Sequence, residues 1–506
     1  MESLFYFCPV KRHIFFFLML SLFAFPAQAY YDFDEKLHLA YTQILKLKLD
    51  EGKELLRQEH LEKPGNHLTL LYENYIDFLK GFISEEESDF IILKKNCAQR
   101  LKIISKDKDD TSSPFHLYVN AEMILQEAML KIKFKEHVSA ATDIRKAYRM
   151  VEKNELIFPT FILNKKLIGF LHVMVGAVPK EYHWLVEMAG MEGTVPQGTS
   201  ELMDLFEHLE GTPYTCYRDE LLFYLGNIHN SFAKNESHGE LLLERMLPST
   251  VDNPLIRYCY ANVAMKMGRN EDALRVLTVP MNPDGVYAFH FLSYKTGLAR
   301  LRKLDYSGEE DFRKFIAQFK GKNYLKAAWQ KVAWISFLKG DQKMYHEYML
   351  KARESGLQFV DEDKEAMTEA SGTDAPNALL LRSRLLFDGG YYKESMHEIA
   401  GMPLDSFPRY RDQLEVTYRF GRILQKMKQV DKAMEYYEQT LKNGSTSRYY
   451  FAANSALLLG MIYEERKDFP KAKSYFEKCL SLDNHEYQNS LDQKAQAGLD
   501  RIRSAE

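Results

Sequence analysis

The stretch from Ala453 to Asn484, ANSALLLGMIYEERKDFPKAKSYFEKCLSLDN, decides the fold of this chain. Apolar residues recur in it at intervals of about three or four positions, which is the spacing of one face of an α-helix. Small residues stand at Gly460 and Ala472, where they let two helices approach closely, and larger residues fill the groove beside them. The stretch therefore predicts a hairpin of two helices.

The order of residues in this hairpin resembles the tetratricopeptide (TPR) family, whose repeat reads W-x2-L-G-x2-Y…A-x3-F…P. Only the first and last positions depart from that pattern, with Ala456 in place of Trp and Asn484 in place of Pro. The matching positions are Leu459, Gly460, Tyr463, Ala472 and Phe476.

The preceding unit has the same register, at Phe420, Gly421, Leu424, Ala433 and Tyr437. Gly421 and Gly460 are 39 residues apart. The excess over the family's period of about 34 residues fits a polar loop at 443–447. The resemblance is strong for residues 414–484, and it implies protein–protein recognition in general without naming a client.

Weaker units precede these two. Each keeps part of the small-residue spacing, as at Ser383 and Leu386, Trp329 and Ala333, Ala261 and Ala273, Leu225 and Gly226, and Ala128 and Ala140. A single hairpin cannot bury its apolar face alone, so neighbouring hairpins must stack. We therefore predict an all-α fold, a superhelical solenoid of TPR-like helix hairpins. An irregular all-α arrangement stays open for the N-terminal third.

The first residues predict a signal peptide over 1–29. Lys11 and Arg12 precede an apolar run from Ile14 to Phe25, and Ala27-Gln28-Ala29 provides a small-residue cleavage site. The alternative is an uncleaved N-terminal anchor. After cleavage no integral membrane span is expected, and the protein should be exported: periplasmic, secreted or peripherally associated with the outer membrane. In general character the chain looks like secreted TPR proteins of Bacteroidetes-type bacteria.

Helix breakers divide the remaining chain. A Gly/Pro-rich loop is expected at 176–200 and a linker at 361–377, where acids mix with Ser, Gly and Pro. These breaks leave three helical parts, which are an N-terminal degenerate TPR-like module at 30–175, central TPR-like helices at 201–360 and C-terminal TPR repeats at 378–506.

Composition excludes several classes of protein. Lys and Arg number 67 against 71 Asp and Glu, for a net charge of −4, so a nucleic-acid partner is not expected. The mature chain has only four cysteines, which are far apart, so a disulfide scaffold is not expected. We expect Cys97, Cys216, Cys259 and Cys479 to be buried thiols on helix faces, although one long-range disulfide stays open.

No zincin, P-loop, nucleophile-elbow or haem-attachment motif occurs in the chain. We therefore expect no enzyme, no cofactor and no metal site. Two places remain as candidate binding sites. The first is the Gly/Pro-rich loop, which either caps the N-terminal module or presents Tyr182, His183 and Trp184 to a partner. The second follows from the TPR resemblance, which implies that the first helix of each hairpin lines the concave face, and its candidates are Arg422, Lys426 and Asn454.

The hypothesis that follows is an exported, non-enzymatic TPR scaffold that mediates protein–protein or protein–peptide interaction in the cell envelope. Its partner is an unidentified protein or peptide, and its oligomeric state is open. One alternative is a SusD-like glycan-binding accessory protein, although such proteins begin with a lipid-anchored cysteine after the signal, which this chain lacks. Another is an enzyme with an unfamiliar helical active site.

Overall fold

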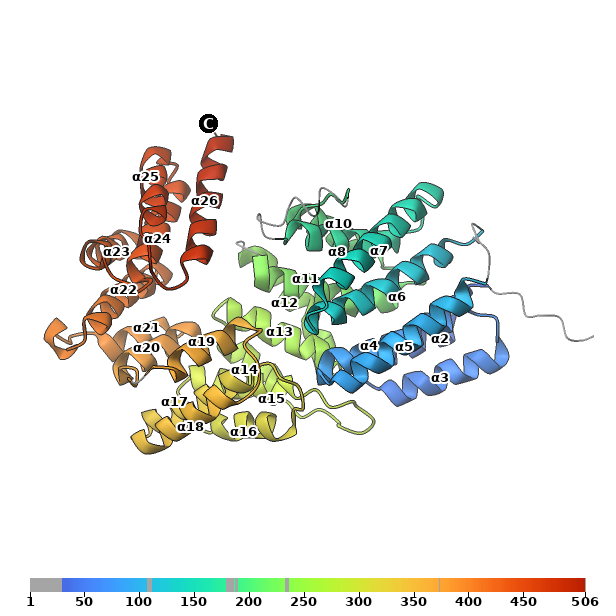
Figure 1. The fold of residues 1–506 in the computed structure, drawn as a ribbon, viewed down its shortest axis with the longest axis horizontal. Coiled ribbons are helices and arrows are strands. Elements are labelled where there is room, and N and C mark those ends of the chain that lie inside the picture. Colours follow the sequence, from blue (N-terminus) through green and yellow to red (C-terminus); the bar gives the residue numbers. More distant parts are fainter. Residues whose placement is uncertain are drawn as a thin grey trace, which may run out of the picture. The chain divides into compact units, whose positions relative to one another are not determined.

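The computed structural model describes residues 30–106, 112–178, 186, 190–232, 236–372 and 374–505. These residues form helices and no strand, apart from an isolated bridge between Tyr30 and Asn66 (Figure 1). The chain divides into two compact units. Unit 1 comprises residues up to Cys259 with 280–289, and unit 2 comprises 260–279 with 290–506. The expectation of an all-α fold of stacked helix hairpins is confirmed.

Unit 1 consists of successive hairpins, in which each first helix packs against the next helix along the chain. Its helices are α2 (Glu35–Leu45), α3 (Leu49–Glu62), α4 (Leu68–Ser84), α5 (Glu87–Ile104), α6 (Pro114–Lys133), α7 (His137–Ile157), α8 (Asn164–Gly176), α10 (Val195–His208), α11 (Arg218–Phe232) and α12 (Glu236–Met246), with 3-10 turns η2 (Thr215–Tyr217) and η3 (Leu247–Val251). Helix α13 (Pro254–Lys266) runs through the division between the units.

Unit 2 continues in the same manner. Its helices are α14 (Asn270–Thr278), α15 (Phe291–Arg302), α16 (Gly308–Gln318), α17 (Leu325–Leu338), α18 (Gln342–Glu354), α19 (Asp361–Ala370), α20 (Ala378–Asp388), α21 (Tyr392–Ile399), α22 (Tyr410–Lys426), α23 (Val430–Gly444), α24 (Phe451–Glu465), α25 (Phe469–Leu480) and α26 (Gln488–Ala505), with the 3-10 turn η4 (Leu404–Ser406). Helix α26 packs against α24 and α25 and ends the array (Figure 1). We call the first helix of each hairpin, such as α17, α20, α22 or α24, its helix A.

Small residues set the distance between the two helices of a hairpin, as the repeat pattern predicts. A β-carbon on Gly421 would lie 2.6 Å from the ring of Tyr437 on α23, so the space that a side chain would need is already filled by the ring. In the hairpin of α20 and α21 the same contact is polar, because Ser383 Oγ donates to the carbonyl of Ser395 at 3.0 Å. Both serines are fully buried. The register assigned from the sequence is therefore correct here.

The segment 361–377 is not simply a linker, because it contains α19. Asp363 is fully buried and accepts hydrogen bonds from the backbone N–H groups of Tyr324, at 2.6 Å, and Ala327, at 3.0 Å, at the start of α17. These N–H groups have no partner within their own helix, so Asp363 satisfies them. The acidic segment 361–370, whose sequence predicts a solvent-exposed linker, is thereby held as a helix against α17 and α18.

Two expected loops are also shorter than the sequence indicates. Helix α10 begins at Val195, inside the stretch 176–200, because Pro196 is tolerated in a first helical turn and the Thr194 hydroxyl accepts from Gln197 N–H at 3.2 Å. Helix α23 runs to Gly444, so the polar loop expected at 443–447 starts later. The division between the units also falls inside 201–360, which the sequence presents as one central part.

The four cysteines Cys97, Cys216, Cys259 and Cys479 are buried free thiols, as expected. Burial raises the pKa of Cys259 and of Cys479 to about 12. Among the described helices, none combines the length and the apolar character that a membrane crossing requires.

Candidate functional site

The inner face of unit 1 is filled by its own side chains. Lys166 on α8 is fully buried, and its Nζ lies 2.9 Å from Glu122 Oε2 on α6 and 2.8 Å from Glu220 Oε2 on α11. The hydroxyl of Tyr75 on α4 accepts from Lys166 Nζ at 2.7 Å, and Tyr41 on α2 donates to Glu220 Oε2 at 2.6 Å. Five helices thus converge on one buried network.

Electrostatics explain how a lysine can be buried there. Burial alone lowers the pKa of Lys166, but the negative charges of Glu122 and Glu220 outweigh it and raise the pKa above its usual value. The ammonium group therefore stays charged between two carboxylates. This arrangement is a structural ion network rather than a general acid or base poised near neutral pH.

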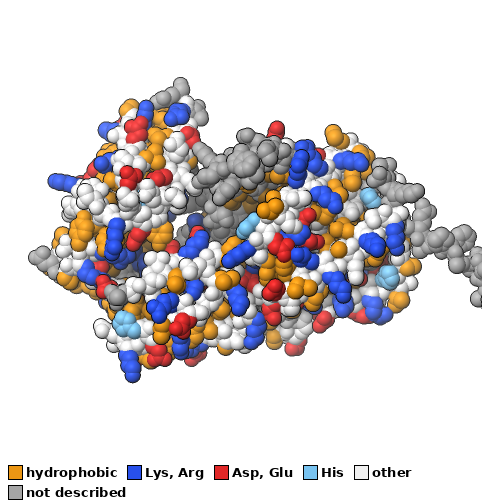
Figure 2. Space-filling model, in the orientation of Figure 1, with side chains coloured by type: hydrophobic (Ala, Val, Ile, Leu, Met, Phe, Trp, Pro, Cys, Tyr) orange, Lys and Arg blue, Asp and Glu red, His pale blue; other side chains and the backbone are white. Residues whose placement is uncertain are grey.

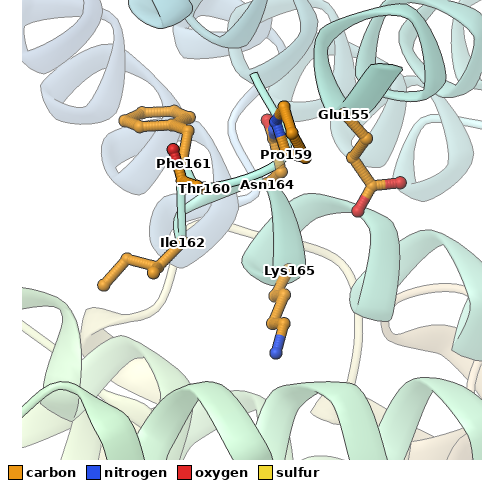
Figure 3. A pocket seen from close by; sticks show the side chains of 7 residues that line it. All are labelled: Glu155, Pro159, Thr160, Phe161, Ile162, Asn164 and Lys165. Carbon is orange, nitrogen blue, oxygen red and sulfur yellow. The ribbon is translucent and has the colours of Figure 1, made fainter. Parts of the chain in front are cut away.

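Two cavities lined by described residues of unit 1 do not form a convincing site. One, of about 50 Å³, is lined mostly by apolar and aromatic residues, with the polar side chains of Asp219, Glu220 and Asn253 beside them. A cavity of roughly 150 Å³ holds a benzene molecule, so this one is too small for an organic ligand of that size. The other, of about 290 Å³, lies where α7 is followed by α8 (Figure 3). Its labelled side chains, including Glu155 and Lys165, spread in different directions rather than converge on one point.

Unit 2 presents a different helix-A face. We call it the Arg384 face, and it consists of Lys331, Trp334, Arg384, Tyr418, Arg422, Tyr450 and Asn454. Its centre is the side chain of Arg384 on α20, whose guanidinium carbon lies 4.5 Å from the centre of the Trp334 ring on α17. Lys331 Nζ lies 3.8 Å from the centre of the same ring. Two cations therefore share one indole, an arrangement in which each is attracted by the ring and repelled by the other.

Arg422 on α22 continues this face. Its Nη1 donates to the Tyr418 hydroxyl at 2.7 Å, and its guanidinium carbon lies 5.0 Å from the centre of the Phe387 ring on α20. Asn454 on α24 donates to the same Tyr418 hydroxyl at 2.6 Å. The centre of the Tyr418 ring is 5.8 Å from that of Tyr450. The face therefore runs without interruption from α17 to α24.

The repeat explains why these side chains point the same way. Arg384 directly follows Ser383, and Arg422 directly follows Gly421, the small residues that meet the second helix of each hairpin. The residue after each small one is turned by about 100° around the helix, away from that contact and towards the helix-A face. Trp334 follows Ala333 in the same way.

Three cations of this face have no carboxylate at ion-pair distance within the described residues. Lys331 Nζ donates to the amide oxygen of Gln330 at 2.5 Å, and Arg422 donates to a phenol. Arg384 lies on the Trp334 ring, and its positive charge acts to lower the pKa of Glu365 and of Glu415 from farther away. Burial lowers the pKa of Lys331 to about 8, and the charge of Arg384 adds to this, against the opposing charges of Glu365 and Glu369. The lowered pKa of Lys331 reflects burial together with local positive charge.

Acidic side chains bound the face at one end. Glu369 on α19 accepts from Trp334 Nε1 at 2.8 Å, from Gln330 Nε2 at 2.6 Å and from the Tyr345 hydroxyl at 3.1 Å. Its oxygens are thus occupied by neutral donors rather than by Lys331 or Arg384. On the side of unit 2 and unit 1 drawn in Figure 2, basic and acidic side chains are interspersed over both units.

The structure places the candidate residues of the sequence unevenly. It brings Arg422 and Asn454 together at the Tyr418 hydroxyl, whereas Lys426 is exposed at the end of α22. Tyr182, His183 and Trp184 lie outside the described residues. Sequence reasoning missed Arg384, Lys331 and Tyr450. Arg384 had a signal, since it follows Ser383 as Arg422 follows Gly421. Among the described residues, no group of His, Cys, Asp and Glu is placed to hold a metal ion.

Comparison with known proteins identifies the repeats. Residues 412–485, which run from the first turn of α22 to just past the end of α25, match the family model described as Tetratricopeptide repeat. The hairpins α22–α23 and α24–α25 are tetratricopeptide repeats. They support a role as a scaffold for protein–protein interaction, and no curated protein matches the chain at a significant level.

Solved structures similar to this chain have low identity to it. The IFIT1 monomeric mutant with Gppp-AAAA is 12% identical, with a TM-score of 0.32 over 89% of this chain and 96% of that one. The Cut9–Hcn1 hetero-tetramer of APC/C is 11% identical, with a TM-score of 0.25 over 93% of this chain and 96% of that one. TM-scores this low do not establish a shared fold over the whole chain.

Proposed function

We propose that this protein is an exported, non-enzymatic scaffold of the cell envelope, which binds a segment of a partner protein on the Arg384 face. The observation that carries the proposal is the set of half-buried polar groups on this face. Arg384, Arg422, Tyr450 and Asn454 combine donors with aromatic surface on successive helices, which is the composition of residues that dominate binding energy at protein interfaces.

The contrast between the two units supports the choice of surface. In unit 1 the buried cation Lys166 is paired with two carboxylates, those of Glu122 and Glu220. In unit 2 the guanidinium of Arg384 retains hydrogen-bond donors that no described residue uses. A partner that supplies acceptors gains those bonds without first breaking bonds inside the protein.

Export is the part of the proposal that rests on the sequence alone. A basic start, an apolar run from Ile14 to Phe25 and the Ala27-Gln28-Ala29 site support cleavage before Tyr30. Fractionation of the native cells, with N-terminal sequencing of the chain, tests it. A mature chain that begins at Tyr30 in the envelope or the medium supports export, and an uncleaved chain in the cytoplasm contradicts it.

Crosslinking in the native cells tests the binding surface. A photo-crosslinking amino acid at Asn454, on the Arg384 face, is compared with the same amino acid at Lys432, an exposed position on the second helix of its hairpin, α23. We expect a defined partner protein to be trapped from position 454 and not from position 432. The proposal fails if both positions trap the same proteins or if neither traps any.

A further inference from the structure

We infer that cleavage before Tyr30 creates an α-ammonium group that the fold binds, with the Gly65 carbonyl as its acceptor and nearby carboxylates as its counter-charge. This inference rests on the export in the proposed function and adds to it a binding site for the amino group that cleavage sets free. It starts from the position of Tyr30, which directly follows the Ala27-Gln28-Ala29 site and is the first described residue.

The chain is fixed in place from Tyr30 onwards. The backbone N–H of Tyr30 donates to the Gly65 carbonyl at 3.0 Å, and the Tyr30 carbonyl accepts from His67 N–H at 3.0 Å. The buried side chain of Asn66 extends this pairing, because it accepts from Asp32 N–H at 3.2 Å and donates to the Asp32 carbonyl at 2.8 Å. The nitrogen of Tyr30 therefore has a defined position and a defined acceptor before α2 begins.

Acidic side chains outnumber the lysine with which they pair at this place. Lys63 Nζ lies 2.8 Å from Asp32 Oδ2 and 3.6 Å from Glu59 Oε1. The same ammonium group pairs with Asp34, so three carboxylates share it. Burial raises the pKa of the Tyr30 phenol, the charge of Lys63 opposes this, and the three carboxylates raise the pKa further. Their negative charges therefore act at Tyr30, where a second cation would be attracted.

Glu59 on α3 shows that the carboxylates lack a donor. Its side chain is fully buried, and its Oε1 accepts from Asn66 Nδ2 at 2.9 Å. Its Oε2 is also buried, and no donor among the described residues reaches this atom. A buried carboxylate oxygen without a donor costs free energy, and a positive charge close to it reduces that cost. Asn66 links this carboxyl group directly to the segment that begins at Tyr30.

Cleavage changes the chemistry of the Tyr30 nitrogen. In the uncleaved chain this nitrogen is a neutral amide with one hydrogen. Hydrolysis breaks the peptide bond between Ala29 and Tyr30, and water supplies the hydroxyl to Ala29 and the hydrogen to the nitrogen. The resulting amine is mostly protonated at neutral pH and has three hydrogens. One of them keeps the bond to Gly65, which becomes charge-assisted and therefore stronger, and two remain for the nearby carboxylates.

The test compares two full chains, one that begins at Tyr30 and one that retains Ala29 before it. Each is released from a fusion by a protease that leaves no residue behind. Tyr30 is 38% exposed, so an amine-reactive reagent can reach the α-amino group, and mass spectrometry of the N-terminal peptide measures the labelling at each pH. His67 and His116, which pack on Tyr31, are the same in both chains.

We expect the α-amino group of the shorter chain to titrate about one pH unit above its ordinary range of roughly 7.7–8.0. The α-amino group of the longer chain should titrate within that range, because it lies one residue away from the site. Hydrogen exchange in 30–34 should be about threefold slower in the shorter chain. Equal titration of the two chains would overturn the inference.

Removal of one carboxylate locates the effect. Asp32→Asn in the shorter chain should lower the pKa of the α-amino group by about half a unit. Glu62→Gln is the matched control, since it removes the same charge from an exposed side chain that pairs with Lys36, and it should change this pKa by less than about 0.2. Equal changes in the two variants would show a general charge effect and overturn the inference. Circular dichroism of each variant confirms that it is folded.

Sequencing of the native N-terminus separates this inference from the proposed function. A native chain that begins at Tyr30 and whose α-amino group titrates in the ordinary range would leave export standing and refute the bound amino group. A native chain in the envelope that begins at another residue would also leave export standing and refute the inference. An uncleaved chain in the cytoplasm would contradict both.

Discussion

A β-carbon built on Gly460 would lie 2.6 Å from the ring of Phe476, so α24 and α25 meet where Gly460 has no side chain. Real β-carbons do not approach other atoms so closely. The second helix of the hairpin therefore occupies the volume that any other residue at this position would need. The same relationship joins Gly421 and Tyr437 one hairpin earlier.

Gly460→Leu should lower the free energy of unfolding by about 1–3 kcal/mol, because the added side chain overpacks the contact with Phe476. Gly372→Leu is the matched control. Gly372 is exposed, and a β-carbon there would meet nothing closer than 3.4 Å. Thermal melts followed by circular dichroism compare the two variants. An unchanged melt of Gly460→Leu would show that the hairpin register is wrong.

Lys166→Met should destabilise the protein by about 3–5 kcal/mol, because it leaves Glu122 and Glu220 buried without their counter-charge. The neighbouring Lys165→Met should cost less than about 1 kcal/mol, since Lys165 pairs with Asp204 at the exposed surface. Urea titration of both variants measures the difference. A double variant of Lys166→Met with Glu122→Gln should recover part of the lost stability. Equal losses of stability in Lys166→Met and Lys165→Met would disprove the buried network.

Lys331 makes the stability of the folded chain depend on pH. Its pKa in the folded chain, about 8, lies below the ordinary value of 10.5, so the unfolded chain binds more protons between these values. The free energy of unfolding should therefore rise with pH in this window, as far as Lys331 contributes. Lys331→Met should lack this contribution. Urea titrations at a series of pH values compare the two chains.

Glu369→Ala should release α19 without unfolding unit 2. Glu369 accepts hydrogen bonds from Gln330, Trp334 and Tyr345, which hold the end of this short helix. Hydrogen exchange should then become faster in 361–370 and stay unchanged in α22 to α25. Glu365→Ala, at an exposed position of the same helix, is the control and should leave exchange as it is.

The repeat register could be predicted from the sequence because close packing of two helices demands a small residue at a fixed place. Gly421 and Gly460 meet that demand within their own hairpins, so the signal is local. Helix α19 could not be predicted in this way. Its helical state depends on Asp363, which binds backbone N–H groups of residues more than thirty positions earlier.

The residues of the candidate site also divide into those that the local repeat pattern predicts and those that depend on long-range contacts. Arg422 and Asn454 follow from the register, because the residues around a helix are fixed once the small position is known. The role of Trp334 as a ring shared by Lys331 and Arg384 does not follow, since it needs a side chain of α20 to reach one of α17. The burial of Lys166 could not be predicted either, because Glu220, whose carboxylate binds the lysine, lies 54 residues away in the sequence.

The buried network of unit 1 has a consequence for how the chain reaches its native state. The bond between Tyr41 and Glu220 joins residues 179 positions apart, so it can form only after all the intervening hairpins have come together. The buried network of unit 1 should therefore form in one step, after its helices have been synthesised. During synthesis, most of unit 1 must leave the ribosome before Tyr41 can reach Glu220. The hairpins α22–α23 and α24–α25 contact their immediate neighbours and can be added one at a time, as in a linear array.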